Sequence, residues 1–405
     1  MTSSLECERV FVPAIGRSPL YPPVDDHDKD AVIRVAAYHD SDLDWYVIRF
    51  SAEQRSSIRA VLSSPLPSIA TPTSSGSRID QLPVEIVWKI LRDLDVASFF
   101  KFRGVNRRAY HIASSLQEYR IIVQYAVQAI MALAETELMP LFTLSDIYSV
   151  LLQKDCTICG PINFSTFIFL PTFQRCCNNC LQSHPSFDVH RVPPQHVQPL
   201  RTTGAPVLRT IPGVYCPEQQ HRPKSQYLST VPPPPPDTGP EPDYLQPGRA
   251  YDVFLAAMTL PHLSFPSSPC SSASSSNTPP IPLVDHGVSC TGCFLASEKY
   301  NAVDVSHYSP QPPDPRYFRH RPYEKDLVRS GPTTTGVLNI WERGFSRDRF
   351  LEHFRWCKEA QRLWEESENG TKEGDGLPWW VSRDEGGVEG GRFLYLAQAG
   401  EHKVP

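Results

Sequence analysis

Paired cysteines are the residues of this sequence whose spacing points most directly to chemistry. Cys156 and Cys159 form one C-x-x-C pair, and Cys177 and Cys180 form a second. The linker between the pairs falls within the range of about 15 to 20 residues that is typical of zinc sites with two such pairs. Two thiolates separated by two residues can turn back onto one ion, and two pairs complete a tetrahedron. Four protein ligands leave no open coordination position, so the sequence predicts a structural zinc ion.

Neighbouring residues leave alternatives open at this first site. Cys176 and Cys177 are adjacent, and only one of them can be the first ligand of the second pair. We favour Cys177, because it has the C-x-x-C spacing, while His184 is a less favoured substitute ligand. The segment from Phe164 to Leu170 alternates enough to be a strand, which predicts a ribbon-like module. The alternative interpretation is a group of four reduced, buried cysteines.

A third C-x-x-C pair, Cys290 and Cys293, stands apart from the first two. Its partners are expected on a late helix, Arg347 to Glu366, in which His353 and Cys357 are spaced i, i+4 and point to one side. These four residues could close a second tetrahedral zinc site with a Cys-Cys-His-Cys ligand set. The alternative is that the histidine lies on the surface and the late cysteine in the core.

A helical segment from Ile79 to Tyr119 precedes the cysteines. Pro83 stands where a helix can start, and Glu85 lies at the positive end of its dipole. Asp95 and Asn106 are expected to cap a second and a third helix. The first helix carries an apolar stripe at helical spacing, made of Ile86, Ile90, Leu91 and Leu94.

The order of these residues resembles the F-box domain. The pattern runs Leu82-Pro83-x-Glu85-Ile86, then Ile90-Leu91-x-x-Leu94, then Val105-x-Arg107. Phe99-Phe100 departs from the family, which more often has Leu-Leu there, but keeps the apolar character. The resemblance implies three helices that dock on the Skp adaptor of a cullin-based ubiquitin ligase. The residues that it assigns to this contact are Leu82, Pro83, Glu85, Ile86, Ile90, Leu91, Leu94, Phe99 and Val105.

The cysteines extend the resemblance to a group of fungal F-box proteins. In that group an F-box is followed by a C-x-x-C pair, an Arg-Cys-Cys-x-x-Cys stretch and a Pro-Gly-x-Tyr turn. Here these are Cys156 to Cys159, Arg175 to Cys180 and Pro212 to Tyr215. The resemblance implies a receptor for an unknown protein client, although leucine-rich, WD and kelch repeats are absent from the sequence.

Composition limits the function classes. A net charge of −5 and a pI near 6.2 argue against nucleic-acid and anionic-membrane partners. The longest apolar stretch, Ile121 to Ala134, is too short to span a bilayer. The N-terminus does not have the pattern of a secretion signal. The 11 cysteines are therefore expected to bind metal and not to form disulfides. The compartment expected is a reducing one, the cytoplasm or the nucleus.

The fold class expected is mainly α, with irregular zinc-braced segments and long disordered parts rich in Pro and Ser, consistent with 41 prolines. Strands are possible at Ala31 to Ala37 and at Trp45 to Phe50. One long helix is expected from Leu116 to Glu135, and another, capped by Thr143 or Ser145, is expected to end at Leu152.

The segments expected are a poorly ordered leader and linker (1–78), an F-box (79–120), connecting helices (121–154), a four-cysteine zinc-ribbon-like module (155–215), a flexible Pro/Ser-rich linker (216–286), a second Cys/His module with a C-terminal helix (287–366) and a flexible tail (367–405).

Two functions are compatible with the sequence. The first is a non-catalytic substrate adaptor of an SCF-type (Skp–cullin–F-box) ubiquitin ligase, which binds the Skp adaptor through the F-box and a client through the zinc-braced region. The second is a zinc-stabilised interaction scaffold that acts outside ubiquitin ligation. An enzyme is disfavoured, because the sequence has no HExxH, phosphate-loop, deaminase or Ser/His/Asp pattern.

Overall fold

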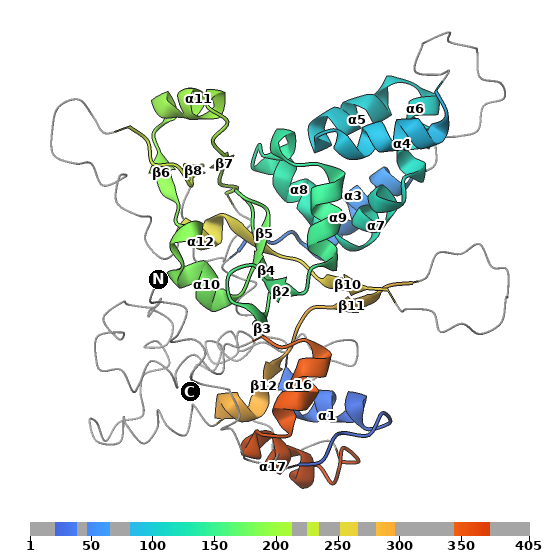
Figure 1. The fold of residues 1–405 in the computed structure, drawn as a ribbon, viewed down its shortest axis with the longest axis vertical. Helices are drawn as coiled ribbons and strands as arrows, with labels where there is room; N and C mark the ends of the chain where they lie inside the picture. Colours follow the sequence, from blue (N-terminus) through green and yellow to red (C-terminus); the bar gives the residue numbers. More distant parts are fainter. Residues whose placement is uncertain are drawn as a thin grey trace, which may run out of the picture.

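The computed structural model describes residues 21–38, 47–64, 82–212, 225–234, 252–265, 281–295 and 344–372. Figure 1 shows helices at the upper right, small sheets in the centre and a separate group of helices below. The upper part and most of the central part share one apolar core, residues 192–207 contain a small core of their own, and the lower group has a third. None of the described helices combines the length and the apolar character that crossing a bilayer requires.

The upper group begins with three short helices, α4 (Val84–Asp93), α5 (Val96–Val105) and α6 (Arg107–Ser115). Two of them start where the sequence predicted a cap. The Asp95 carboxylate accepts a hydrogen bond from the Ser98 amide at 2.8 Å, and the Asn106 side chain accepts one from the Ala109 amide at 2.7 Å. Each cap satisfies a backbone N–H that the first helical turn leaves without a partner.

The predicted long helix from Leu116 to Glu135 is wrong in one respect. The chain forms two helices, α7 (Gln117–Tyr125) and α8 (Val127–Glu135), separated by Ala126 at φ −139°. The break lets the apolar faces of both short helices enter the same core. The 3₁₀ helix η3 (Met139–Leu141) follows, and then α9 (Leu144–Leu152), which starts at a capping box on Thr143, one of the two caps that the sequence predicted.

The centre of the molecule is built from short strands that pair across long stretches of sequence. One antiparallel sheet has the order β5-β4-β9, and a second has the order β6-β8-β7. The elements of the first region are β2 (Asp155–Cys156), β3 (Gly160–Phe164), β4 (Phe167–Phe169), β5 (Gln174–Cys176), α10 (Asn178–Ser183), α12 (Asp252–Leu255) and β9 (Ala257–Thr259). The second contains η4 (Pro185–Phe187), β6 (His190–Val192), α11 (Pro194–Thr202), β7 (Val207–Arg209) and β8 (Tyr227–Ser229).

A hairpin joins the centre to the lower group. Strands β10 (His262–Ser264) and β11 (Leu283–Asp285) pair antiparallel, and after β11 the chain runs down toward the lower group (Figure 1). Gly287 has φ +77°, and a Cβ there would lie 2.6 Å from the Phe164 ring, so only glycine fits at this crossing. A neighbouring bridge between Val288 and Phe345 brings the returning chain alongside.

The lower group combines both ends of the described chain. It contains α1 (Lys29–Ala36), β1 (Ala37–Tyr38), β12 (Ser289–Cys290), α16 (Arg347–Phe354) and α17 (Lys358–Glu366). Strand β1 pairs antiparallel with β12, and α1 packs against α16 and α17. The ring of Tyr21 meets that of Phe354 edge-on at 5.4 Å, so the start of the described N-terminal segment also contacts α16.

These contacts correct three expectations. Ala31 to Ala37, expected as a strand, is mostly helix α1, because its apolar residues Val32, Val35 and Ala36 follow helical spacing and are buried. The region expected as a poorly ordered leader also supplies α3 (Ala52–Ser63), which packs on α7 and α8. Within the strand expected at Trp45 to Phe50, only Ile48 forms a β-bridge among the described residues. Strands β8 to β11 all lie within the predicted flexible linker 216–286.

Two other predicted elements differ in extent. The strand expected from Phe164 to Leu170 is shorter, at Phe167–Phe169, and the helix expected from Arg347 to Glu366 is two helices. The Pro-Gly-x-Tyr turn beyond Pro212, residues 235–251 of the predicted Pro/Ser-rich linker and the tail after residue 372 lie outside the described residues.

Candidate functional site

Helix α4 exposes part of its apolar stripe. Ile86 and Ile90, one helical turn apart, are 47% and 46% exposed, whereas Val87 and Leu91 on the other side are buried. Leu82 and Leu94 are half-buried against the core, and the side chain of Phe99 is fully buried. Val105, at the end of α5, is 71% exposed. Pro83 and Glu85 are exposed.

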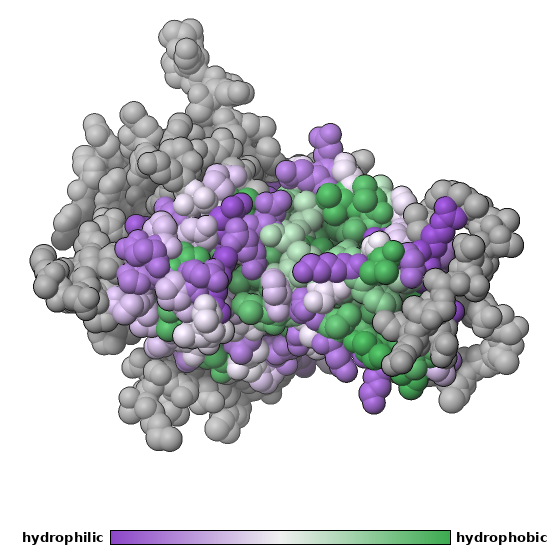
Figure 2. Space-filling view, turned by 90° about the horizontal axis from the view of Figure 1, so that it is seen from above, coloured by the Kyte–Doolittle hydropathy of each residue, from purple (hydrophilic) through white to green (hydrophobic). Residues whose placement is uncertain are grey.

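The residues assigned to one contact are thus divided between surface and core. Figure 2, viewed from above, shows apolar side chains at the surface on the right, where α4, α5 and α6 lie, with hydrophilic side chains between them. Burying such side chains against a partner gains about 25 cal/mol for each Å² of apolar surface removed from water. Ile86, Ile90 and Val105 are therefore the large apolar members of the predicted set that a partner can cover, and Pro83 and Glu85 are exposed beside them.

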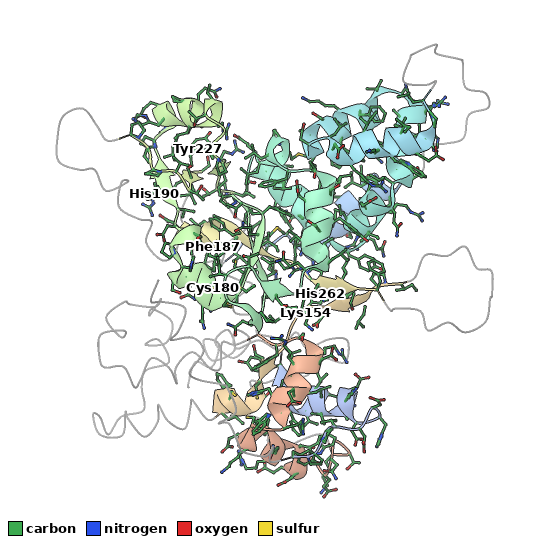
Figure 3. All side chains as sticks on the ribbon, viewed as in Figure 1. Lys154, Cys180, Phe187, His190, Tyr227 and His262 are labelled. Atoms are coloured by element: carbon green, nitrogen blue, oxygen red, sulfur yellow. The ribbon has the colours of Figure 1, made fainter. Side chains whose placement is uncertain are left out.

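The first cysteine cluster brings together Cys156, Cys159, Cys177 and Cys180, whose sulfurs all lie within 4.8 Å of one another. The sulfurs of Cys159 and Cys177 are 3.7 Å apart. Zn–S bonds of about 2.3 Å in a tetrahedron place sulfurs about 3.8 Å apart, so the spacing fits one ion. Cys156 ends β2, and Gly160 at φ +66° makes the turn after the first pair. Figure 3 shows Cys180 on α10.

The second pair of the cluster lies at the start of a helix, which departs from the ribbon-like module expected. Cys177 is the N-cap of α10, and Cys180 lies within it. The sulfur of Cys176 points away, toward the Phe167 carbonyl at 3.8 Å, and is not part of the cluster. The structure therefore separates the two adjacent cysteines, and it gives Cys177 the position that the spacing favoured. The less favoured ligand His184 is not part of the cluster either, and its Nδ1 accepts a hydrogen bond from the Ser186 amide.

The four thiols interact strongly. Hydrogen bonds, first with Cys159 and then with Cys177 and Cys180, hold the pKa of Cys156 far below its ordinary value. The contact with Cys156 raises the pKa of Cys159, but contacts with Cys177 and Cys180 outweigh it and leave a value of about 7. The pKa values of Cys177 and Cys180 are raised, first by Cys156. The cluster thus releases its first protons readily and its last ones with difficulty, unless a cation stabilises the remaining thiolates.

The second cluster brings together Cys290, Cys293, His353 and Cys357, again within 4.8 Å of one another. The sulfur of Cys357 lies 3.8 Å from that of Cys290 and 3.9 Å from that of Cys293, close to the spacing expected around one ion. His353 Nε2 lies 3.2 Å from the Cys293 sulfur, and the ring of Phe345 stacks on the imidazole at 4.6 Å. This packing fixes the orientation of the imidazole.

Two helices supply the late ligands of this cluster. His353 lies in the last turn of α16, and Cys357 is the N-cap of α17. Gly292 allows α17 to approach, because a Cβ there would lie 2.3 Å from the Ala360 nitrogen. Burial raises the pKa of Cys290, whereas hydrogen bonds with Cys290 and then Cys293 lower that of Cys357. Both clusters thus have donor sets and spacings that could hold a metal ion.

Comparison with known protein families matches one part of the chain, residues 79–121, to the F-box domain. Residues 79–121 are an F-box domain. No curated protein and no solved structure matches the chain. The match covers α4 to α6 and the start of α7, so it includes the exposed apolar residues and excludes both cysteine clusters.

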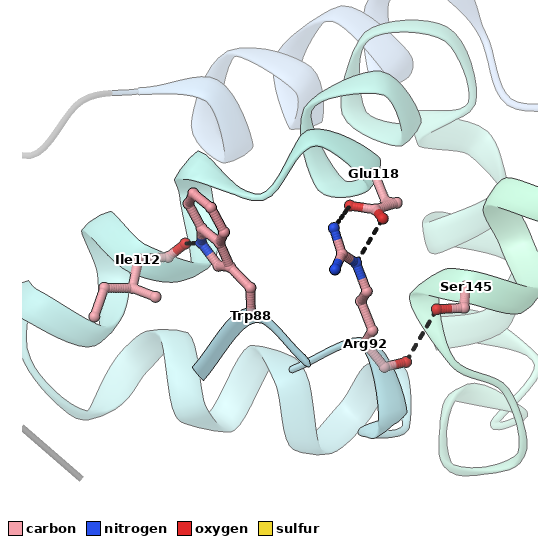
Figure 4. A network of polar contacts seen from close by, with 5 residues as sticks. All are labelled: Trp88, Arg92, Ile112, Glu118 and Ser145. Carbon is pink, nitrogen blue, oxygen red and sulfur yellow. Dashed lines mark hydrogen bonds and ion pairs between the residues drawn. The ribbon is translucent and has the colours of Figure 1, made fainter. Parts of the chain in front are cut away.

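The F-box is held to the helices behind it by polar contacts that Figure 4 shows. The Trp88 indole N–H donates to the Ile112 carbonyl at 3.2 Å, which joins α4 to α6. The Arg92 guanidinium pairs with Glu118 on α7 at 2.6 Å, and the Ser145 hydroxyl on α9 donates to the Arg92 carbonyl at 3.2 Å. These contacts and the shared core fix the exposed side of α4 relative to the central sheets.

Sequence reasoning missed the role of Arg175. Its side chain is fully buried beside the first cluster, and burial lowers its pKa to about 9. The guanidinium donates to the carbonyls of Val150 at 2.6 Å, Ser165 at 2.7 Å, Leu260 at 3.2 Å and Pro261. It therefore joins the end of α9 to the segments around β4 and β10. The only signal in the sequence was the arginine of the Arg-Cys-Cys-x-x-Cys stretch.

Proposed function

We propose that this chain is a non-catalytic substrate adaptor of an SCF-type ubiquitin ligase. The observation that carries the proposal is the F-box domain at residues 79–121, with Ile86, Ile90 and Val105 exposed on it. Exposed large apolar side chains on neighbouring helices favour docking on a partner. The partner is the Skp adaptor, which links the chain to a cullin ligase in the cytoplasm or nucleus. Ubiquitin transfer belongs to these partners.

We propose further that both cysteine clusters bind zinc as a structural ion. Each offers four protein ligands, three or four of them sulfur, which are the donors that structural zinc sites use. Four protein ligands leave no position for a substrate, so the ion would brace the fold and not act on a substrate. Zinc measured per purified chain tests this directly. Two equivalents of zinc per chain are expected. One equivalent would contradict the second site, and a chain without zinc would contradict both sites.

The client is expected to bind behind the F-box. The central sheets share a core with the F-box, and Arg92, Glu118 and Ser145 fix the helices between them. A rigid connection holds a bound client at a constant distance from the ligase. This supports assigning client recognition to the zinc-braced part of the chain and adaptor binding to the F-box.

Binding to the Skp adaptor tests the proposal. The double variant Ile86→Ala, Ile90→Ala is expected to lose most of its affinity, because truncation of buried interface anchors costs about 2 kcal/mol each or more. The control is Ile58→Ala, Val61→Ala on α3, which removes two exposed apolar side chains outside the F-box. Both doubles should unfold at similar temperatures, since neither removes a buried side chain.

The same measurement separates the adaptor from a zinc-stabilised scaffold outside ubiquitin ligation. A scaffold of that kind would show no saturable binding of the Skp adaptor by the unmutated chain while retaining its metal. Equal loss of binding in the α3 control would show that the F-box surface is not the contact. Either result would contradict the proposed function.

A further inference from the structure

Helix α3 ends at a serine that is followed by proline. Ser64 is the C-cap residue of α3, and Pro65 comes next in the sequence. A serine or threonine directly before a proline is the acceptor pattern of proline-directed protein kinases. The sequence has such pairs at Ser18, Ser64, Thr71, Ser268, Thr278 and Ser309. Of these acceptors, only Ser64 lies within the residues that the structure describes.

The hydroxyl of Ser64 is presented at the surface. Ser64 is exposed, and its backbone, at φ −59° and ψ 125°, has left the helix, as the proline after it favours. Its hydroxyl donates to the Ala60 carbonyl at 2.6 Å. No residue of α3 is buried, so opening its last turn exposes little new apolar surface. A kinase can therefore reach this hydroxyl without unfolding the domain.

Three side chains of the F-box bind the last carbonyls of α3. The Arg103 guanidinium and the Tyr119 hydroxyl donate to the Leu62 carbonyl at 2.9 and 3.0 Å. The Tyr110 hydroxyl donates to the Ser64 carbonyl. The guanidinium also lies 3.9 Å from the centre of the Tyr110 ring, a cation–π distance. Arg103 and Ser64 thus contact the same tyrosine, so a group added to the serine lies close to the guanidinium.

Arg103 has donors to spare and no acid to neutralise it. Its Nε donates to the Ser114 hydroxyl at 3.1 Å, but a guanidinium has five N–H groups, and several remain. The side chain is half-buried, and within the described part of the chain no carboxylate forms an ion pair with it. Guanidinium groups bind phosphate through two parallel hydrogen bonds. This position therefore favours a phosphate beside it.

Two effects at the end of α3 oppose a negative charge there. The C-terminal end of a helix carries a partial negative charge, and phosphorylation removes the hydrogen bond from the Ser64 hydroxyl to Ala60. The dipole effect is screened by solvent at an exposed residue. Hydrogen bonds between a guanidinium and a phosphate are roughly twice as strong as those between neutral groups. We therefore expect the ion pair to outweigh both effects.

We propose that Ser64 is a phosphorylation site for a proline-directed kinase, and that its phosphate pairs with Arg103 and ties α3 to the F-box. In the transfer, the Ser64 Oγ attacks the γ-phosphorus of ATP held by the kinase. The Oγ–P bond forms while the bond from the γ-phosphorus to the bridging oxygen breaks. ADP leaves, and the hydroxyl proton passes to a carboxylate of the kinase. The inference does not depend on adaptor binding, since it concerns the contact between α3 and the F-box.

The first test is phosphate transfer to the folded full chain. The five other acceptors are replaced by alanine, which leaves Ser64 as the only serine or threonine before a proline. A mitogen-activated protein kinase with ATP is expected to add one phosphoryl group per chain, measured by intact mass. Ser64→Ala should abolish the addition, whereas the matched control Ser63→Ala, at an exposed neighbour, should retain it. A folded chain that stays unmodified, or equal modification of Ser64→Ala, would overturn the proposal.

The second test is the pKa of the phosphate, followed by phosphorus NMR on the modified chain. The second pKa of phosphoserine is about 6. A guanidinium beside the phosphate favours the dianion, so this pKa should fall to about 5 in the folded chain. It should return to about 6 in urea and in Arg103→Gln. Lys101→Gln, which removes a positive charge from an exposed position of the same helix, is the control and should keep the lowered value.

The comparison of the folded and urea-unfolded chain needs no variant, so it decides the pairing even if Arg103→Gln does not fold. The same phosphate pKa in both states would show that the phosphate has no cationic partner in the fold. A lowered pKa that Arg103→Gln leaves unchanged in a folded chain would assign the partner to another residue. Either result would contradict the pairing with Arg103.

Discussion

The first candidate metal centre takes all four side chains from Cys156–Cys180, whereas the second joins Cys290 and Cys293 to His353 and Cys357. The first is embedded in the core that the F-box shares, since Cys156 and Cys177 belong to it. The second lies in a separate core that includes the N-terminal helix α1. The same kind of donor set therefore lies within the body of the protein in one place and between the two ends of the described chain in the other.

The difference shows that ligand spacing predicts which residues form a site, but not which part of the fold depends on that site. Closing the longer loop of the second centre costs more chain entropy, about 0.6 kcal/mol for each doubling of length. The contacts of α1 with α16 and α17 and the pairing of β1 with β12 contribute to offsetting this cost. We therefore expect loss of the first ion to damage the whole fold and loss of the second to damage one module.

The largest effect is expected from Cys177→Ser. Structural zinc contributes about 10 to 16 kcal/mol in small zinc modules, so losing the first ion should unfold the core around β2 to β5. Zinc content and thermal unfolding measure this. Cys176→Ala is the control, because its sulfur lies outside the cluster. It should keep both ions at a cost of about 1 kcal/mol. Two ions retained by Cys177→Ser would break the comparison.

Cys357→Ser should have a large but local effect. The second ion is lost, and the backbone amides of α1 and β1 should lose protection from hydrogen exchange, because their packing surface is no longer held. The F-box amides should keep theirs. Lys358→Ala, an exposed neighbour, is the control and should retain two ions. Protection of α1 that survives loss of the ion would contradict the role given to this centre.

Arg175→Lys should destabilise the main body by about 3 kcal/mol. A lysine ammonium cannot reproduce the fork of a guanidinium, so buried carbonyls lose their donors. Denaturant unfolding measures the change. Arg191→Lys is the comparison. That arginine pairs with the buried Asp252, but its own side chain is 44% exposed, so the substitution should cost less. Equal effects would mean that burial at Arg175 is not decisive.

Gly292→Ala should have a smaller effect than Cys177→Ser, Cys357→Ser and Arg175→Lys. It should act on the second centre alone. Its Cβ would meet the backbone of Ala360, so α17 must shift and zinc affinity should fall, which chelator competition measures. Gly104→Ala in α5 has open space and should stabilise by about 0.5 to 1 kcal/mol. A Gly292→Ala chain with unchanged affinity would show that this close approach is not required.

Local chemistry was predictable from the sequence. Asp95, Asn106 and Thr143 start helices where their side chains predicted, since a cap needs only the next three residues. The ligand sets were predicted by short-range spacing and come together in the structure, although their zinc remains a prediction. Even the pairing of Cys290 with His353 across a long gap was proposed from two local spacings.

Only the tertiary structure decided what each element packs against. It turned Leu91 of α4 and Phe99 of α5 inward while leaving Ile86 and Ile90 of α4 exposed. The apolar stripe of α4 is wider than the side of the helix that meets the core, so part of it faces solvent. It also placed α1 beside the second centre. Such contacts depend on residues far apart in the chain, and no local pattern encodes their distance. The sequence therefore determined the caps and candidate ligands, and long-range packing decided which surfaces remained for partners.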